Sequence, residues 1–512
     1  MSISALNKSV HRLQALAVVL FVTLCVGLSS VQFFARPSLW EKGSPSALGS
    51  NNDLRQDPRN PRILIERYSR PRGSIVARGS DGATVTLASS TKDENGYYTR
   101  SYADGPLYSH VTGYISMTQQ ASTGLEQTED SVLTGRAQSL WWSRLRDAIR
   151  NQNQRGGSIE TTIDPKIQKA AQEALGNRSG SVVAMDPRTG AILALVSTPT
   201  FDPNPLASLN SSTALDASKS LAAQSGAPLV NRALNGQYAP GSTFKILTAA
   251  AGIRSGKVKP DTQVSAPDRI TLPGTNHQME NYAGESCGNG VVSLSYAFAR
   301  SCNTPFAQLG MDVGEKSLRA EAEAWGFNSQ VSVPLHVTDS VYTPNGDDQA
   351  RTALAGIGQG GVTSTPLMMA MVAATVANQG QQMQPHLISR VLDQRLNTVQ
   401  KTQPQVLRTP ISKDTAKSLS TMMQQVVGSG TGTTAQVAGV TVAGKTGTAE
   451  SDSQQAGDGP TTWFIGFAGT DIAKPTIALA VVLDSGPQTN HGTGGSLAGP
   501  IAAQVIDAAV DQ

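Results

Sequence analysis

Charged and aromatic side chains are scarce in this 512-residue sequence. Charged residues make up 15% of it, aromatic residues 5%, and the formal net charge is only +3. No run of basic residues suggests nucleic-acid binding, and there is no acidic tail. We therefore expect no nucleic-acid partner. The three cysteines and six histidines form no cluster with the spacing of metal ligands, so we also expect no metal site.

Charge is absent from residues 13–35, between Arg12 and Arg36. A helix of that length would be about 34 Å long, enough to cross a bilayer as a single-pass anchor. Lys8 and Arg12 precede the stretch, so the positive-inside rule places residues 1–12 in the cytoplasm and the rest of the chain outside the cell membrane. A cleaved signal peptide is the alternative, but the stretch is long for one and no small-x-small cleavage site follows.

Two regions of different composition follow the uncharged stretch. Residues 36–60 are rich in Pro, Ser, Asn and Asp, which is typical of a tether. Residues 61–155 contain short strand-like segments and one predicted helix at Ser139–Ile149. Because no motif in residues 61–155 indicates catalysis, we interpret these residues as a strand-rich pedestal for structural support or partner contact. The predicted strands lie at residues 63–65, 74–77 and 84–87.

The remaining residues, 156–512, have the pattern of an α+β domain. Asp164 and Pro165 are typical of a helix start, and Gly176 of its end. Strand-like runs occur at both ends of the region, so we expect one antiparallel five-stranded sheet flanked by helices, with a helical lobe of residues 242–440 inserted. The predicted strands are 181–185, 191–196, 440–444, 462–468 and 476–483; the predicted helices lie near 293–300, 304–311, 317–325, 365–378, 412–427 and 497–510.

The first candidate site is the stretch from Tyr238 to Gly252, where a Pro-Gly turn precedes an apolar, Ala-rich run typical of a buried helix. Ser242 lies where this helix is expected to begin, and Lys245 follows one turn later on the same face. A serine becomes a nucleophile when a neighbouring base takes its proton, and a lysine with a lowered pKa can be that base. The simpler interpretation is a helix-capping serine beside a solvated lysine.

A second pair of polar residues, Ser301 and Asn303, is expected on a loop between two predicted helices. In one cleft, Ser301 could relay a proton and Asn303 could hold a substrate amide; the simpler interpretation is a loop that caps the next helix. Cys302 stands between them, 15 residues after Cys287. Disulfides persist outside the cytoplasm, so these two cysteines are candidates for a disulfide. The alternative is two buried free thiols.

The third motif is Lys445-Thr446-Gly447-Thr448, at the end of a predicted strand. Gly447 would let a substrate backbone approach closely. The Lys445 charge and the two threonine hydroxyls make a candidate carboxylate site. A lysine that guards an exposed sheet edge is the simpler explanation.

The three motifs together have the order and context of a known family. Ser-x-x-Lys at 242, Ser-x-Asn at 301 and Lys-Thr-Gly at 445 match the signature of penicillin-binding proteins and serine β-lactamases, except that cysteine replaces aspartate in the middle motif. With its expected anchor and pedestal, the chain resembles the class B penicillin-binding proteins, in particular the actinobacterial A type. Supporting stretches are residues 72–76, 162–165, 356–361, 365–367 and 444–449.

The resemblance implies a peptidoglycan D,D-transpeptidase with a serine β-lactamase-like fold, a dimerisation-type pedestal and no metal or organic cofactor. It would cross-link D-Ala-D-Ala stem peptides through an acyl-enzyme, β-lactam antibiotics would trap it, and cell-wall or division proteins would be its partners. The roles carried over are Ser242 as nucleophile, Lys245 as base, Ser301 as proton relay and Asn303 for the acyl amide. Lys445, Thr446 and Thr448 would bind the terminal carboxylate, and Gly447 would let the substrate backbone approach.

Four rival functions share some of these features. A class A β-lactamase needs a Glu-x-x-Leu-Asn loop to hydrolyse its acyl-enzyme, and none lies between Asn303 and Lys445. A bifunctional class A enzyme needs a glycosyltransferase domain, for which the residues between the anchor and Gly156 are too few. A D,D-carboxypeptidase differs only in using water as the acceptor. A catalytically silent division scaffold is the non-enzyme alternative.

Overall fold

The structure is a computed structural model that describes residues 17–24, 70–94, 96–116, 118–150, 155–344, 346, 348–450 and 458–510. The chain divides into two compact units, residues 1–66 and 67–512. In the first unit only residues 17–24 are described, and they are helical. The rest of the expected anchor 13–35, the segment 1–12, the tether 36–60 and the strand 63–65 lie outside the described residues. None of the helices among the described residues is long and apolar enough to cross a membrane.

A five-stranded antiparallel sheet forms the centre of the larger unit, in the order β19-β20-β21-β7-β8. Its strands match those predicted and come from both ends of the region: β7 (Gly180–Met185), β8 (Ile192–Thr198), β19 (Thr441–Ala449), β20 (Thr461–Gly469) and β21 (Ile477–Leu483). The strands are buried on both faces. Val182 and Ala184 pack with α7 (Pro165–Leu175) and α17 (Gly499–Val510), whereas Val183 and Met185 join the core that contains α15 (Pro366–Ala377), as the alternation of strand side chains requires.

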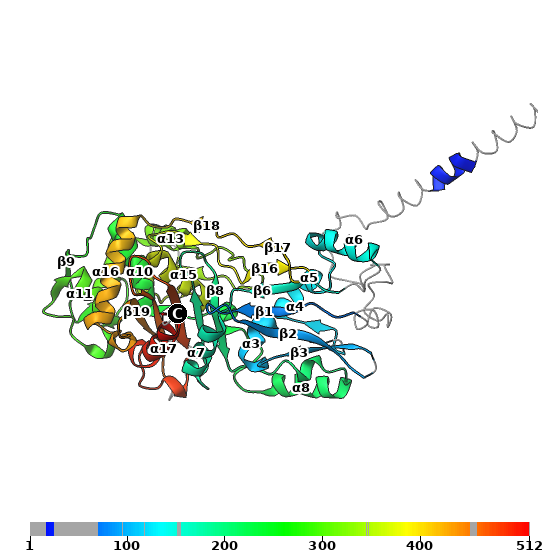
Figure 1. The fold of residues 1–512 in the computed structure, drawn as a ribbon. Coiled ribbons are helices and arrows are strands. Elements are labelled where there is room, and N and C mark those ends of the chain that lie inside the picture. The colour runs from blue at the N-terminus through cyan, green and yellow to red at the C-terminus, as the bar shows by residue number, and fades with distance from the viewer. Residues whose placement is uncertain are drawn as a thin grey trace, which may run out of the picture. The chain divides into compact units, whose positions relative to one another are not determined.

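Helix boundaries follow the expected capping chemistry where it was predicted. The Asp164 carboxylate accepts hydrogen bonds from the N–H groups of Lys166 and Ile167, and Gly176 ends α7 at φ 59°. The other described α-helices after residue 156 are α8 (Ser211–Ala223), α9 (Arg232–Asn235), α10 (Lys245–Arg254), α11 (Leu294–Ala299), α12 (Thr304–Val313), α13 (Glu315–Trp325), α14 (Gln349–Gly356) and α16 (Lys413–Ser429). Of these, α8, α9 and α14 were not predicted. Figure 1 shows α16 and α17, in orange and red, on either side of β19.

A six-stranded sheet, in the order β17-β16-β6-β1-β2-β3, lies beside the first. The strands β1 (Ile75–Arg78), β2 (Thr84–Lys92) and β3 (Tyr98–Tyr102) belong to the predicted pedestal, but β6 (Ser158–Thr161), β16 (Ile388–Leu392) and β17 (Thr398–Lys401) follow residue 155. The segment 61–155 therefore supplies only part of this sheet. The predicted helical lobe at 242–440 contains helices, but it also contains strands that were not predicted, among them β16 and β17.

Candidate active site

The candidate nucleophile Ser242 lies in a tight 3₁₀ turn, Gly241–Phe244, that leads directly into α10. The sequence predicted a Pro-Gly turn followed by a helix that begins near Ser242, and in the structure the 3₁₀ turn extends through Phe244, so the α-helix itself begins at Lys245. Gly241 has φ 52° and donates its N–H to the Gly358 carbonyl at 3.0 Å. A Cβ on Gly358 would lie 2.2 Å from the Gly241 oxygen, so a glycine is needed there to support the turn.

The Lys245 side chain is fully buried, which contradicts the interpretation of a solvated lysine. Its Nζ donates to the Ser301 carbonyl at 2.6 Å and to Asn303 Oδ1 at 2.9 Å, and it lies 5.6 Å from the centre of the Phe306 ring. Burial, and then the positive charge of Lys445, hold the Lys245 pKa well below its ordinary value. A neutral amine has two N–H groups, which these two acceptors occupy, and one lone pair, which is left for a proton from a nearby hydroxyl.

Ser301 joins the two candidate lysines from the loop between α11 and α12, where the sequence predicted it. Its φ of 59° is unusual for a residue with a side chain. In this conformation its carbonyl accepts from Lys245 while its Oγ accepts from Lys445 Nζ at 2.7 Å. Because Ser301 Oγ accepts this bond, its own O–H is left to donate to a substrate.

Asn303 stands at the N-terminus of α12 without capping it, which contradicts the simpler interpretation of this loop. Its Oδ1 accepts from Lys245, and its Nδ2 donates to the Glu280 carbonyl at 3.0 Å. The backbone N–H of Asn303 donates to Asn281 Oδ1 at 2.8 Å. Asn281 therefore fixes this loop, although no sequence motif indicated it.

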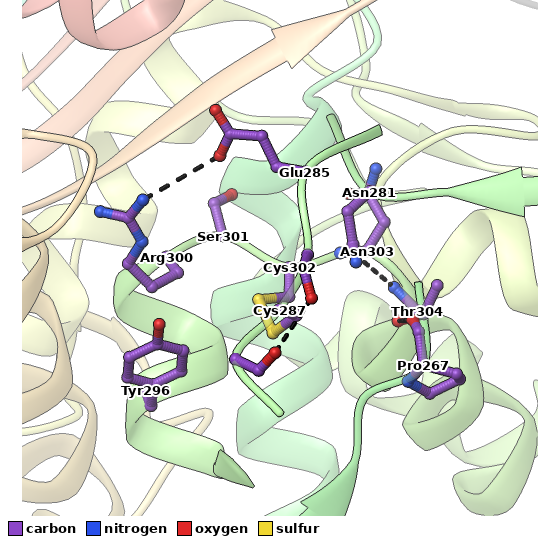
Figure 2. The surroundings of a disulfide bond; sticks show 12 residues. Pro267, Asn281, Glu285, Cys287, Tyr296, Arg300, Ser301, Cys302, Asn303 and Thr304 are labelled. Carbon is purple, nitrogen blue, oxygen red and sulfur yellow. Dashed lines mark hydrogen bonds and ion pairs between the residues drawn. A yellow bond between two sulfur atoms is a disulfide. The ribbon is translucent and has the colours of Figure 1, made fainter. Parts of the chain in front are cut away.

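A disulfide ties the same loop to the segment in front of it. Cys287 and Cys302 are bonded, so the residue between Ser301 and Asn303 is covalently joined to the chain 15 residues earlier (Figure 2). Arg300 and Glu285 lie 4.0 Å apart beside the bond. In the structure these two cysteines are thus not free thiols.

Lys445 is also fully buried, so it is no guard of an exposed edge. Its Nζ donates to Ser301 Oγ and to the Thr446 carbonyl at 3.0 Å, and burial lowers its pKa to about 7. The Thr446 and Thr431 hydroxyl oxygens are 2.5 Å apart, so one donates to the other and the second proton is free to meet an anion. Thr431 follows α16 and was not predicted.

Gly447 has a structural reason that the sequence did not indicate. A Cβ at this position would lie 2.9 Å from Thr243 Cγ2 and 3.0 Å from the Pro240 oxygen. Because Gly447 has no side chain, β19 can lie against the turn Gly241–Phe244 that carries Ser242, here called the nucleophile turn. The contact between Gly447 and a substrate backbone stays a prediction. Thr448 is half-buried on the same strand, and its Oγ1 accepts from the Gly494 N–H at 3.3 Å.

Asp484, at the end of β21, anchors the chain that leads into the nucleophile turn. Its carboxylate accepts from Tyr238 OH at 2.8 Å, Arg232 Nε at 2.8 Å and Ser179 Oγ at 2.6 Å. The Tyr238 ring packs edge-on against Trp463. No spacing in the sequence indicates this cluster, because its members are brought together only by the sheet.

The assembled groups suit acyl transfer to a hydroxyl. A serine at a helix start lies one turn from a buried amine, and a second buried amine touches the hydroxyl that stands between them. Among the described residues, neither lysine forms an ion pair with a carboxylate. The described parts of the chain also contain no group of His, Cys, Asp and Glu that could hold a metal ion.

Two family profiles match the chain. The profile described as the penicillin-binding protein transpeptidase domain covers residues 180–507, and the one described as the penicillin-binding protein A dimerisation domain covers residues 72–159. The first spans the five-stranded sheet and all three motifs. The second spans β1, β2, β3 and part of β6.

Similar proteins extend over the whole chain. The peptidoglycan D,D-transpeptidase PbpA of Mycolicibacterium smegmatis is 38% identical, with 99% of each chain covered, and that of Mycobacterium tuberculosis is 37% identical, again with 99% of each covered. The ceftriaxone acyl-enzyme structure of M. tuberculosis penicillin-binding protein A has a TM-score of 0.82 at 39% identity, covering 87% of this chain and 100% of that one. Its penicillin G acyl-enzyme structure has a TM-score of 0.80 at 38% identity, covering 86% and 99%. The chain therefore belongs to the penicillin-binding protein transpeptidase family, as a class B member similar to penicillin-binding protein A.

Proposed function

We propose that this chain is a peptidoglycan D,D-transpeptidase that cross-links stem peptides through an acyl-enzyme on Ser242. One observation carries the proposal: a buried Lys245 with a lowered pKa, its two N–H groups occupied by Ser301 and Asn303, lies one turn after that serine. A lysine held in this way is a base rather than a cation.

In the first half-reaction, Ser242 Oγ attacks the carbonyl of the D-Ala-D-Ala bond and Lys245 takes its proton. The carbon–nitrogen bond then breaks, and the terminal D-Ala amine leaves with a proton delivered from the Ser301 hydroxyl. Lys445 donates to that hydroxyl and supports the transfer. In the second half-reaction, an amine from a neighbouring stem peptide attacks the acyl-enzyme and loses a proton to Ser301, which replaces the one given up earlier. The ester C–O bond then breaks, and Lys245 returns its proton to Ser242 Oγ, which restores both groups.

The substrate carboxylate and the developing oxyanion need separate partners. We assign the carboxylate to Lys445, Thr446 and Thr448, because a buried cation and two hydroxyls lie together along β19. The oxyanion would lie between the backbone N–H groups of Ser242 and Thr448, each worth about 3–4 kcal/mol in the transition state. Asn303 has one N–H beyond the one given to Glu280, and it would hold the substrate amide.

The expected location and domain division are part of the proposal. We place residues 1–12 in the cytoplasm, residues 13–35 in the membrane, a tether at 36–60, a dimerisation-type pedestal at 61–155 and the transpeptidase domain at 156–512. The charge pattern around the uncharged stretch supports this orientation. Cell-wall and division proteins are the proposed partners outside the membrane.

The intact mass of the full chain, measured over hours with benzylpenicillin, tests the proposal. We expect a stable adduct of one antibiotic mass on Ser242 and its loss in Ser242→Ala, where acylation falls on the order of 10⁶-fold. A transient adduct with turnover would identify a β-lactamase. Folded protein that forms no adduct would favour the scaffold. A stem peptide that loses D-Ala to water but never to an amine would identify a carboxypeptidase.

A further inference from the structure

The helix α6 (Trp141–Ile149) presents its apolar side chains to solvent. Trp142 is 70% exposed and Ile149 77%, and Trp141 and Leu145 are also exposed. The two indole rings pack edge to face with centroids 4.4 Å apart. Residues 141, 142, 145 and 149 lie on one side of a helix, so these side chains form a continuous apolar face.

The opposite side of α6 is polar and buried. Ser143 and Asp147 are only 8% and 4% exposed, and the Ser143 hydroxyl donates to the Leu140 carbonyl. A helix that packs on a protein core normally buries its apolar face and exposes its polar one. In α6 the apolar face is exposed and the polar face is buried, so the apolar face is suited to contact a surface outside this unit.

The exposed charges on and beside α6 are positive. Arg146 and Arg150 are exposed, and Arg144 is half-buried on the same helix. The acidic residue of the helix, Asp147, faces inward. The buried Asp393 is the acidic neighbour that feels the charge of Arg146. Burial raises the pKa of Asp393, but hydrogen bonds from Asn397 and from backbone N–H groups, together with the Arg146 charge, outweigh it and lower the pKa overall. An apolar face rimmed by arginines is complementary to an anionic lipid surface.

The chain enters the larger unit beside the segment that carries α6. The Gly73 N–H donates to the Leu133 carbonyl at 2.8 Å, and the Gly156 N–H donates to the Pro71 carbonyl at 3.1 Å. Both ends of the segment 134–155 therefore lie next to residues 71–73, near the start of the described part of this unit. Figure 1 shows α6 at the opposite end of the unit from α11 and β9 (Gln263–Ser265), which lie on the active-site side.

We propose that α6 is an interfacial foot that inserts Trp141, Trp142, Leu145 and Ile149 into the headgroup region of an anionic membrane. Tryptophan is the residue that favours this region, and arginines beside it bind lipid phosphates. The inference rests on the proposed membrane anchor, which supplies a high local concentration of lipid. The foot fixes the pedestal end of the unit at the bilayer and directs the active site away from it, toward the cell wall.

Tryptophan emission reports the contact directly. Trp325 and Trp463 are fully buried, so exposed emission comes from α6 once Trp40, outside the described residues, is replaced by Trp40→Phe. The full chain with this replacement is reconstituted in vesicles of phosphatidylglycerol and phosphatidylcholine, with or without bromine on the acyl chains near the headgroups. We expect bromine to lower the α6 emission about twofold, as for a helix buried at the interface.

Matched variants separate the foot from a general effect. Leu145→Ser with Ile149→Ser keeps both reporters but removes the apolar grip, so most of the quenching should disappear. Leu215→Ser, an exposed apolar residue of α8 (Ser211–Ala223), should leave the quenching unchanged. The benzylpenicillin adduct on Ser242 should form equally in all variants, which verifies their folding and keeps the test independent of the proposed chemistry.

Equal tryptophan emission in brominated and plain vesicles would overturn the proposal. The apolar face of α6 would then be covered by something other than lipid, such as another protein, a second copy of the chain or residues 36–69. Quenching that survives Leu145→Ser with Ile149→Ser would also overturn it. Extraction of the chain by alkaline carbonate, measured after the emission, would reject the anchor alone. Loss of the Ser242 adduct in the parent chain would reject the proposed function alone.

Discussion

The two sheets of the larger unit bury charged side chains in opposite ways. Beside the six-stranded sheet, the fully buried Glu126 accepts from Arg72 Nε at 2.6 Å and from Arg100 Nε at 2.5 Å. Beside the five-stranded sheet, Lys245 and Lys445 are equally buried, but they donate to carbonyl, amide and hydroxyl oxygens. Burial is the same in both regions, and only the partner differs.

The partner decides which protonation state each region favours. Burial alone would lower the pKa of Arg72, but the charges of Glu126 and Asp130 outweigh it and the pKa is raised. Neutral acceptors cannot offset the burial of the lysines, so their pKa values fall. Charges in the pedestal are therefore held as charges and support the fold, whereas the active site keeps amines that can exchange protons.

Of changes to the two buried lysines, removal of Lys245 should have the larger effect on acylation and little effect on stability. In Lys245→Met, the acylation rate with benzylpenicillin should fall about 10²–10⁴-fold, because the proposed general base is lost. The free energy of unfolding in urea should stay constant or rise, because a buried amine without a charged partner is replaced by an apolar chain of similar length. A large loss of stability would instead make this lysine a structural residue.

Removal of Arg100 should have the opposite signature. Arg100→Met leaves a buried carboxylate short of a partner, so the free energy of unfolding should fall by about 3–5 kcal/mol. The acylation rate of the folded protein should be unchanged. Arg136→Met is the matched control: its pair with Asp130 is more exposed, so the expected loss is about 0.2–1 kcal/mol. Equal losses in the two variants would contradict the contrast between the regions.

The pH dependence of acylation should reflect the titration of both Lys245 and Lys445. In the proposed mechanism Lys445 binds a carboxylate only when protonated, so with a pKa of about 7 its contribution should decline as pH rises through that value. Lys245 acts only when neutral, so the rate should also decline as pH falls through its lowered pKa. In Lys445→Arg the alkaline decline should disappear, because an arginine keeps its proton. An alkaline limb that persists in this variant would assign it to another group.

Local patterns account for what could be predicted of the fold and of the site. The strands β7, β8 and β21 are rich in Val, Ile, Leu and Ala, and β20 adds Trp and Phe to the apolar pattern. The proposed chemistry of Ser242 and Lys245 depends on one helical turn. The buried state of both lysines could not be read from these patterns. It depends on the α11–α12 loop and on β19, which are more than 100 residues apart.

Long-range pairing explains what the sequence did not predict. The strand β16 pairs with β6 across more than 200 residues, and the Arg390 guanidinium donates to Glu160 there. Such short strands have little local signal, so residues 388–401 were included in a helical lobe. Asn281 and Thr431 were missed for the same reason, because each acts only through a residue that the fold brings to it.

The cluster around Asp484 shares a feature with each region. Its Arg232–Asp484 ion pair is of the kind found beside the six-stranded sheet, but its hydrogen bond from Tyr238 connects it to the chain that leads into the nucleophile turn. Tyr238→Phe removes one hydrogen bond to Asp484 and keeps the ring against Trp463 and the Arg232 pair. Stability should fall by about 1 kcal/mol. If the pair positions the turn, the acylation rate should fall as well, with unchanged pH dependence because no titrating group of the reaction is altered. A loss of stability alone would show that the cluster supports the fold as the pedestal pairs do, and that the turn is held by Gly358 and Gly447 instead.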